Sequence, residues 1–416
     1  NRLSNRWEKC RTTTFLQAIA CAPGTLQLFA QTVAAHISRQ NNWHRNRHAG
    51  TKIKRGQRFV VPVIDLFAGP GGLSEGFEQY RVGTKPVFQC VLSIEKERNP
   101  HKTLLLRAFF RQFAKVPDDY YRHTRGELSL EDLYKKYTKE YAQATAHAIR
   151  LALAYRNRER IDKLIRKALR GRKTNWVLIG GPPCQAYSLA GRVKIKDESG
   201  IKFEKDRRHF LYKEYLRIVE KFKPPVFVME NVKGLLSSST KSGKSTKNGE
   251  TFRRILDDFA NAGYSVHSFV KSGSGKELRP IDYVIKAEKY GIPQARHRVI
   301  LFGIRKGVDR GSSLLRPKKK VSIQSAVGDL PRIRSQISPP SRDSFEAWQR
   351  ELFLLKSVFT QDEKLRKMNG SRRVLSSLPI GATFIDTRYP SVARSKWLRK
   401  HDAWFIDRRL RGVTLH

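Results

Sequence analysis

The chain has 416 residues, of which 83 are Lys or Arg and 37 are Asp or Glu, and its formal net charge is +46. This excess of positive charge predicts a polyanionic partner such as nucleic acid, and no apolar run approaches the length of a spanning helix, so we expect a soluble protein rather than a membrane protein. The four cysteines include no CxxC pair and no Cys/His cluster at zinc spacing, so we expect no structural metal and a reducing compartment: they are Cys10, Cys21, Cys90 and Cys184.

Residues 1–58 are rich in Arg, His, Asn and Gln. We expect a basic, partly disordered leader there, and the alternative is an arm that contacts DNA phosphates. The sequence begins with Asn rather than Met and has only two methionines. We therefore expect a fragment of a longer reading frame.

The first predicted strand covers 59–67 and ends at a glycine cluster, and 73–80 then reads as a helix. A strand, a glycine turn and a helix in this order let the backbone approach a ligand closely. A second strand over 87–94 ends in Glu95, which is where such folds bind ribose hydroxyls. The glycine pattern is not GxGxxG, which argues against a dinucleotide and an NAD-dependent enzyme.

A helix is predicted from Asn99 to about Phe113. After a polar break, apolar residues recur at three- and four-residue spacing from Leu130 to Tyr155, which predicts one long helical stretch. We expect this helical insertion to cover an edge of the sheet, and the alternative is that its Arg and Lys form a DNA-facing surface.

A short apolar run, 176–179, predicts a buried strand that leads into Gly-Gly-Pro-Pro-Cys-Gln-Ala-Tyr-Ser, residues 180–188. A free cysteine is most often a small buried hydrophobe. Here Cys184 follows a strand and two prolines, a placement that presents the thiol and suits a nucleophile, whose reactive form is the thiolate.

Beyond a Lys-rich segment that contains Arg192, a helix is predicted over 208–220 and a strand over 226–229. That strand carries Glu230 at its C-terminal end. Ligands of open α/β sheets gather at the C-terminal ends of strands. We therefore expect Gly69, Glu95, Cys184 and Glu230 on one edge of the sheet.

A helix over 251–262 and strands over 264–269, 281–287 and 299–304 follow. The loop before the last strand ends in Arg296-His297-Arg298. Two arginines at alternate positions entering a strand would point to one side, toward the same anion or base edge. From about residue 306 the sequence is basic, Ser-rich and irregular.

Four motifs in this order resemble the DNA (cytosine-5)-methyltransferase family. The resemblance runs from about Val60 to Arg305 and implies an α/β fold, the S-adenosylmethionine-dependent methyltransferase (Rossmann-like) sheet with helices on both faces. A smaller, irregular target-recognition region would follow over 306–416. The motifs lie at 63–72, 180–188, 228–232 and 294–298, so that the leader would be 1–58 and the catalytic domain 59–305, with the helical insertion at about 115–172.

The resemblance implies that the glycine-rich stretch binds S-adenosylmethionine, with Phe67 against the adenine and Glu95 on the ribose hydroxyls. The insertion obscures the family's third motif, an acidic side chain that recognises the adenine amine, so no residue is assigned that role. The full set of expected cofactor residues is Phe67, Gly69, Gly71, Gly72, Glu95, Pro183 and Leu211.

The resemblance also implies catalytic roles. Cys184 would add to C6 of a flipped-out cytosine, and Glu230 would bind N3 and the exocyclic amine, which requires a proton on a carboxyl whose pKa is raised. Arg298 would donate to O2, and Arg296 would brace the cysteine loop or a phosphate. The residues expected to contact DNA are Gln185, Ser188, Arg192 and Gln294.

The expected function is therefore DNA cytosine C5 methylation on double-stranded DNA by a monomeric, cytoplasmic enzyme of bacterial type, associated with the nucleoid and with restriction-modification. Alternatives are the same fold acting on RNA and a non-catalytic nucleic-acid-binding relative. The family normally has a helix and a Gly-Asn motif after the recognition region. Because the chain stops without either, we expect a truncation before the last motifs.

Overall fold

The structure is a computed structural model of the whole chain, and its description covers residues 33–34, 60–124, 126–172, 175–183, 211–237, 249–307, 314–327, 346–347, 350, 384–386 and 412–414. The chain divides into two compact units. The first comprises Asn1–Ala114 and Lys139–Val321, and the second comprises Lys115–Thr138 and Ser322–His416.

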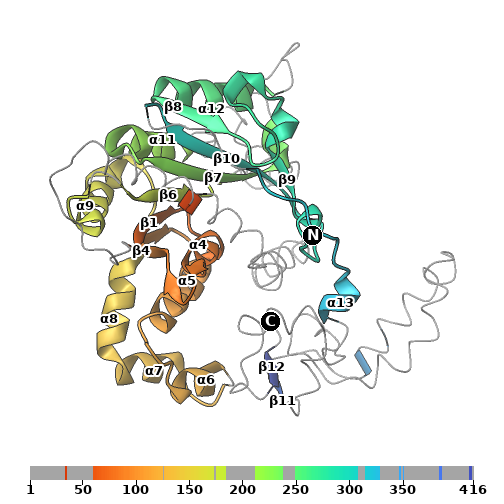
Figure 1. Cartoon of the computed structure of the whole chain (residues 1–416). Coiled ribbons are helices and arrows are strands. Elements are labelled where there is room, and N and C mark those ends of the chain that lie inside the picture. The colour runs from red at the N-terminus through yellow and green to blue at the C-terminus, as the bar shows by residue number, and fades with distance from the viewer. Residues whose placement is uncertain are drawn as a thin grey trace. The chain divides into compact units, whose positions relative to one another are not determined.

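The first unit is organised around a sheet in which the order of the strands is β5-β4-β1-β6-β7-β10-β8, with β9 paired to β10 (Figure 1). The strands β5, β4, β1, β6 and β7 are parallel, whereas β10 runs antiparallel to β7, β8 and β9. The strands are β1 (Val61–Leu66), β4 (Phe88–Glu95), β5 (Ala148–Arg150), β6 (Val177–Gly180), β7 (Val226–Val232), β8 (Tyr264–His267), β9 (Val284–Lys286) and β10 (His297–Arg305).

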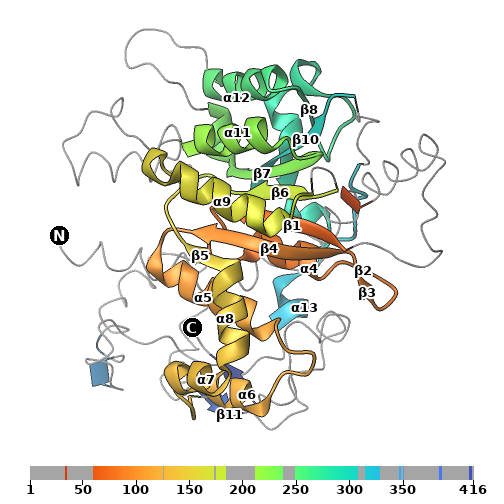
Figure 2. The same cartoon turned by 90° about the vertical axis from the view of Figure 1, so that its left-hand side faces the viewer.

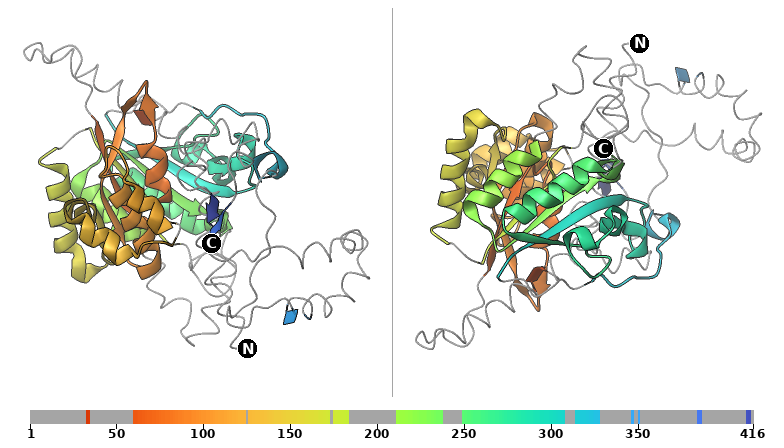
Figure 3. Two further views of the ribbon diagram at one scale, coloured as in Figure 1. Left: turned by 90° about the horizontal axis from the view of Figure 1, so that it is seen from below. Right: turned by 90° about the horizontal axis from the view of Figure 1, so that it is seen from above.

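Helices cover both faces of this sheet (Figures 2 and 3). They are α4 (Gly72–Glu78), α5 (Arg98–Phe110), α9 (Arg158–Leu169), α11 (Leu211–Phe222) and α12 (Glu250–Asn261), whereas α8 (Thr138–His147) projects away from the sheet (Figure 2). The connecting 3-10 turns are η1 (Tyr155–Asn157), η4 (Lys233–Ser237), η5 (Gly275–Glu277), η6 (Pro280–Tyr283) and η7 (Ala287–Lys289), and β2 (Arg81–Val82) and β3 (Lys85–Pro86) form a hairpin. No described helix is long and apolar enough to cross a membrane.

The apolar strands are buried on both faces because alternate side chains of a strand point to opposite sides. In β6, Leu178 joins a core cluster with Ile165 of α9 and Tyr215 of α11. Its neighbours Val177 and Ile179 join the other cluster. The continuous apolar runs that predicted strands at these positions are therefore the signature of a two-faced core.

The described part of the second unit comprises short elements, which are α6 (Asp118–Thr124), α7 (Leu130–Lys136), α13 (Ile323–Val327), and the paired strands β11 (Phe384–Asp386) and β12 (Gly412–Thr414). Within it, Asp119 of α6 accepts a hydrogen bond from Tyr137 and lies 2.5 Å from Lys136 Nζ. These contacts join the ends of α6 and α7.

The single helical stretch expected from Leu130 to Tyr155 is wrong. The helix breaks at Tyr137, α8 ends at His147, and Ala148–Arg150 forms β5, which pairs in parallel with Ser93–Glu95 of β4. Ala148, Leu151 and Leu153 are buried. A short apolar run satisfies both helical and strand spacing, and here the hydrogen bonds offered by the β4 edge decide between them.

Close packing between β7 and β10 requires a glycine at 303. Gly303 lies opposite Phe227, and a Cβ at this position would overlap the Phe227 ring. We expect Gly303→Ala to lower the free energy of unfolding by about 1–3 kcal/mol, measured by denaturant titration. In a Gly303→Ala/Phe227→Leu double variant the loss should be smaller than the sum of the two single losses. Additive losses would contradict this steric account.

Candidate active site

The C-terminal ends of four parallel strands meet on one edge of the sheet. Leu66 of β1 lies level with Ile94 of β4 and with Gly180 of β6, and Gly180 lies level with Met229 of β7. The residues that follow these four positions therefore share the edge: they are Phe67, Glu95, Gly181 and Glu230. Cys184 was expected on the same edge and lies outside the described residues, as do Gln185, Ser188 and Arg192.

The glycine-rich loop after β1 has an unusual backbone. Phe67, Gly69 and Gly71 have φ values of 54°, 56° and 84°, in the left-handed region that favours glycine. An aromatic residue in this region is strained, and strain of this kind is concentrated at functional sites. A Cβ at Gly71 would lie 2.9 Å from Leu104 Cδ1 of α5, so both conformation and space require glycine there.

Glu95 connects this loop to β4. Its Oε2 accepts a hydrogen bond from the Gly69 N–H at 2.7 Å, and its Oε1 accepts one from the Glu97 N–H at 2.7 Å. The carboxylate is buried. Each oxygen keeps a second lone pair, so the group can still accept hydrogen bonds from a diol while it holds the loop.

Asp65 is a buried acidic residue of β1 to which the sequence analysis assigned no role. Neither of its carboxyl oxygens has a hydrogen-bond partner among the residues that the structure describes. Burial raises the pKa of Asp65 to about 7, with the nearby Ser74 hydroxyl acting against the shift and Glu95 adding to it. Position in a strand identifies this residue as buried, but only the structure shows that its charge is uncompensated.

Glu230 and Arg298 come together across neighbouring strands. Arg298 Nε lies 2.7 Å from Glu230 Oε1, and both side chains are half-buried. In the β7–β10 pairing Glu230 lies opposite Ile300 and Arg298 opposite Val232, so the two side chains meet diagonally. Arg298 also donates from Nη1 to its neighbouring carbonyl at His297, at 2.8 Å. The ion pair therefore has a fixed position on the edge.

The described start of the cysteine loop is anchored to the same strand. Asn231 Nδ2 donates to the Pro182 carbonyl at 3.3 Å, while Asn231 Oδ1 accepts from the Val232 N–H at 2.9 Å. A Cβ at Gly181 would lie 3.2 Å from Glu230 Oε2. The chain that leads to Cys184 thus passes directly beside the Glu230 carboxylate, and Pro183 is its last described residue before Cys184.

The other expected residues differ in their placement. Arg296 precedes β10, which begins at His297, so the alternation argument holds only for Arg298, inside the strand. Arg296 and Gln294 are half-buried in the loop before β10, where the Arg296 N–H donates to the Gln294 carbonyl at 2.9 Å. Leu211 is the first residue of α11 and is half-buried.

No residue was assigned to the family's third motif, the acidic side chain that recognises the adenine amine, and the structure shows which residues lie at the end of the next strand, β5. β5 is the strand next to β4, and its C-terminal end carries Arg150, Leu151 and Ala152, none of which is acidic. The Leu151 N–H donates to the Glu95 carbonyl at 3.0 Å, and Asn157 Nδ2 holds the Ala152 carbonyl at 2.8 Å. In the sequence, the end of β5 is marked only by the alternate leucines Leu151 and Leu153, a spacing typical of a strand.

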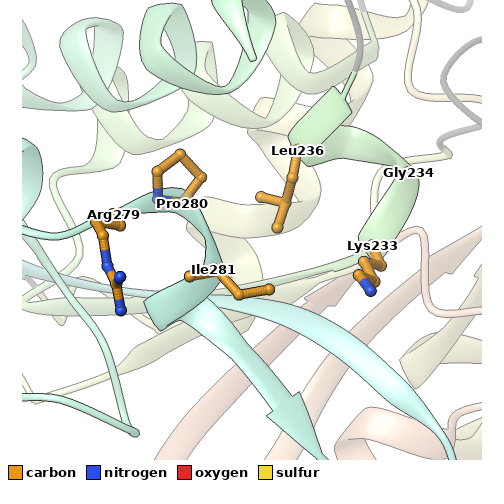
Figure 4. A pocket seen from close by; sticks show the side chains of 6 residues that line it. All are labelled: Lys233, Gly234, Leu236, Arg279, Pro280 and Ile281. Atoms are coloured by element: carbon orange, nitrogen blue, oxygen red, sulfur yellow. The ribbon is translucent and has the colours of Figure 1, made fainter. Parts of the chain in front are cut away.

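A pocket of about 500 Å³ lies beside this edge, between η4 and η6 (Figure 4). Its walls are apolar at Leu236, Pro280 and Ile281, and Lys233 and Arg279 contribute positive charge. None of the expected site residues that the structure describes lines it. Within the described residues, no group of three or more His, Cys, Asp or Glu side chains is placed to hold a metal ion.

The mixed sheet, with its glycine loop and acidic residues on one edge, defines an S-adenosylmethionine-dependent methyltransferase of Rossmann-like fold. The chain belongs to the C-5 cytosine-specific DNA methylase family, whose model matches residues 133–392, more than half of the chain. This confirms the resemblance seen in the motifs. Enzymes of this family use S-adenosylmethionine as the methyl donor.

Two curated relatives are type II methyltransferases. M.Bpa9945I of Bacillus paralicheniformis is 34% identical over 271 residues, which cover 59% of this chain and 54% of that protein. M.DdeI of Desulfomicrobium norvegicum is 34% identical over 279 residues, which cover 66% of this chain and 49% of that protein. The chain spans about half the length of these relatives. A solved structure, the Entamoeba histolytica methyltransferase EhMeth, matches with 15% identity and a TM-score of 0.33 over 67% of this chain and 68% of that one.

The raised pKa of Asp65 predicts a pH dependence of stability. The native protein holds this proton up to about pH 7, whereas the unfolded chain releases it near the ordinary value of 3.8. Asp65 therefore lowers the free energy of unfolding as pH rises between these values, by up to about 1.4 kcal/mol per pH unit. We expect Asp65→Asn to remove this decline in denaturant titrations from pH 4.5 to 7.5. Equal slopes in the two proteins would show that Asp65 does not titrate in this range.

Proposed function

We propose that the protein transfers a methyl group from S-adenosylmethionine to C5 of a cytosine in double-stranded DNA, through a covalent bond between Cys184 and C6. The observation that carries this proposal is the 2.7 Å ion pair of Glu230 and Arg298 beside Gly181–Pro183, the backbone that leads directly to Cys184. A carboxyl group and a guanidinium beside the backbone that leads to a cysteine supply the kinds of group that this reaction needs.

The residues of the glycine loop fit the methyl donor. The open space beside Gly69, where a Cβ would meet no atom within 4 Å, suits close approach of a ligand to the backbone, and the free lone pairs of Glu95 suit a ribose diol. When bound, S-adenosylmethionine supplies an electrophilic methyl group. Phe67 would contact the adenine, and the remaining residues of the proposed cofactor site are Gly69, Gly72, Pro183 and Leu211.

Catalysis would begin with the Cys184 thiolate, which forms a bond to C6 of the cytosine and makes C5 nucleophilic. Glu230 would bind N3 and the exocyclic amine as charge develops on the ring, and Arg298 would donate to O2. Their mutual contact at 2.7 Å supports a position for both side chains against one side of a single base. After C5 has accepted the methyl group, a base removes the C5 proton, the C6–S bond breaks, and the thiolate is restored.

The base must leave the duplex for this chemistry, because C6 is inaccessible to a thiol inside the stack. We propose that Gln185 and Ser188 hold the opened duplex, that Arg192 and Gln294 contact DNA, and that Arg296 braces the cysteine loop. The region 306–416 would recognise the target, after the catalytic domain 59–305 and the basic leader 1–58. The protein would act as a monomer in the bacterial cytoplasm, at the nucleoid, as part of restriction-modification.

Duplex DNA that contains 5-fluorocytosine tests the reaction. Fluorine at C5 cannot leave as a proton, so the methylated intermediate should stay bonded to the protein. We expect a denaturation-resistant protein–DNA adduct that requires S-adenosylmethionine and is absent in Cys184→Ala. Absence of the adduct with the unchanged protein would count against the proposal, and an adduct formed only with fluorinated transfer RNA would show that the substrate is RNA.

A comparison of two variants separates the catalytic role of Glu230 from the structural effect of losing an ion pair. We expect Glu230→Gln, which keeps the size but loses the proton donor, to slow adduct formation by about 10²–10⁴-fold. The matched control is Glu288→Gln, because Glu288 pairs with His297 at 2.9 Å and is similarly exposed, at 26% against 31% for Glu230. Quench-flow rates that fall equally in the two variants would assign Glu230 a structural role only.

A further inference from the structure

Helices α4 and α5 are joined by a group of charged side chains that the reaction itself does not use. The α4–α5 ionic cluster comprises Glu75 and Glu78 of α4 with Arg107 of α5 and Arg111, which follows the last residue of α5. Arg111 lies against both carboxylates, through Nη2 to Glu75 and through Nε to Glu78 Oε2 at 2.6 Å, and Arg107 Nη1 lies 3.3 Å from Glu75. The four side chains are only 11–27% exposed.

The cluster is electrically balanced and largely removed from water. Burial acts to raise the pKa of Glu75, but Arg111 and Arg107 outweigh it and hold that pKa below its usual range. Burial raises the pKa of Glu78, against the effect of Arg111. A buried ion pair adds little net stability, because desolvation offsets its attraction, whereas loss of one partner leaves an uncompensated charge. The role of the cluster therefore lies in the positions that it gives to α4 and α5 rather than in the stability that it adds.

One end of the cluster touches the glycine loop. The loop leads directly into α4, which begins at Gly72. From the other side, the turn of α5 that carries Arg107 packs on the loop, since a Cβ at Gly71 would lie 2.9 Å from Leu104 Cδ1 and 3.8 Å from Arg107 Cδ. The spacing of α4 and α5 therefore sets the position of the loop.

The other end of the cluster reaches β4. The register of β1 against β4 shifts where Val63 pairs with Cys90 and Ile64 with Leu92, so that Val91 is passed over in a bulge. At this bulge the Cys90 N–H donates to Glu78 Oε1 at 3.2 Å. Bulges of this kind redirect a strand and are frequent next to active sites. The strand so held ends at Glu95.

We propose that Arg111 is a positioning residue for the methyl donor. By holding Glu75 and Glu78 it sets the distance between the glycine loop and β4, and so maintains the 2.7 Å contact between the Gly69 N–H and Glu95. Its effect on cofactor affinity is indirect, because the ionic contacts of its side chain among the described residues are with α4. This inference rests on the proposed function in one respect, which is that the loop and Glu95 bind S-adenosylmethionine.

The test compares two arginines of similar burial, since the Arg111 side chain is 24% exposed and that of Arg217 is 18% exposed. Arg111→Met removes the centre of the cluster. Arg217→Met is the control, because Arg217 pairs with Asp162 at 2.9 Å between α11 and α9, and the two side chains are 18% and 5% exposed. Calorimetric affinity for S-adenosylhomocysteine, affinity for duplex DNA and denaturant stability are measured for both variants and for the unchanged protein.

Both substitutions should lower stability, since each removes an ionic partner from a buried carboxylate. Only Arg111→Met should weaken S-adenosylhomocysteine binding, by about 10- to 100-fold, with DNA affinity unchanged. Equal cofactor affinity in Arg111→Met and the unchanged protein would overturn the positioning role. Failure of the unchanged protein to bind S-adenosylhomocysteine would instead refute the proposed function, and this proposal with it.

A double variant separates positioning from stability. Arg111→Met combined with Glu78→Gln removes the carboxylate that loses its ionic partner, while Glu75 keeps Arg107 at 3.3 Å, so stability should return toward that of the unchanged protein. The amide cannot restore the original spacing, and the weak cofactor binding should persist. Recovery of affinity together with stability would show that the cluster is structural only. This variant decides the question even if Arg111→Met alone does not fold.

Discussion

Parallel hydrogen bonding among β4, β1, β6 and β7 is the constraint on which the candidate site depends. Because the strands run in one direction and in register, the residues that leave their C-terminal ends emerge side by side. Phe67, Glu95, Gly181 and Glu230 are widely separated in the sequence, and this pairing alone makes them neighbours. Each then gains a specific partner, such as the Gly69 N–H for Glu95, only because the strands have already set the distance.

The antiparallel strand β10 supplies Arg298, the positively charged partner of Glu230. Because β10 runs antiparallel to β7, it begins at the edge where β7 ends, and its second residue, Arg298, therefore lies near Glu230. The close approach of the two strands depends on Gly303, whose missing side chain makes room for the Phe227 ring. The position of Arg298 next to Glu230 is therefore a product of strand packing as well as of charge attraction.

Sequence alone predicted the central strands and the glycine loop, because a strand buried on both faces leaves a continuous apolar run and a left-handed turn requires glycine. The sequence did not predict β5, since the apolar residues from Ala148 to Leu153 fit the spacing of a helix and also that of a strand. The free edge of β4, with which β5 pairs, decides in favour of the strand. The sequence analysis also assumed that charged residues on a helix mark its solvent-exposed face. Arg111 and Glu75 show the limit of that rule, because whether a charged face meets water or another helix depends on tertiary packing. Arg296 was grouped with Arg298 by spacing, yet the strand starts between them.

The second unit is built from two stretches of chain, Lys115–Thr138 and Ser322–His416, with most of the first unit between them in the sequence. A ribosome releases these stretches in order, so α6 and α7 emerge long before the residues with which they form a unit. Domains generally fold as they are synthesised, and a segment that awaits distant partners exposes surface meanwhile. The sheet of the first unit must accordingly form while the segment Lys115–Thr138 still lacks its partners, because these have not yet been synthesised. The order of synthesis is therefore part of how this chain reaches its fold.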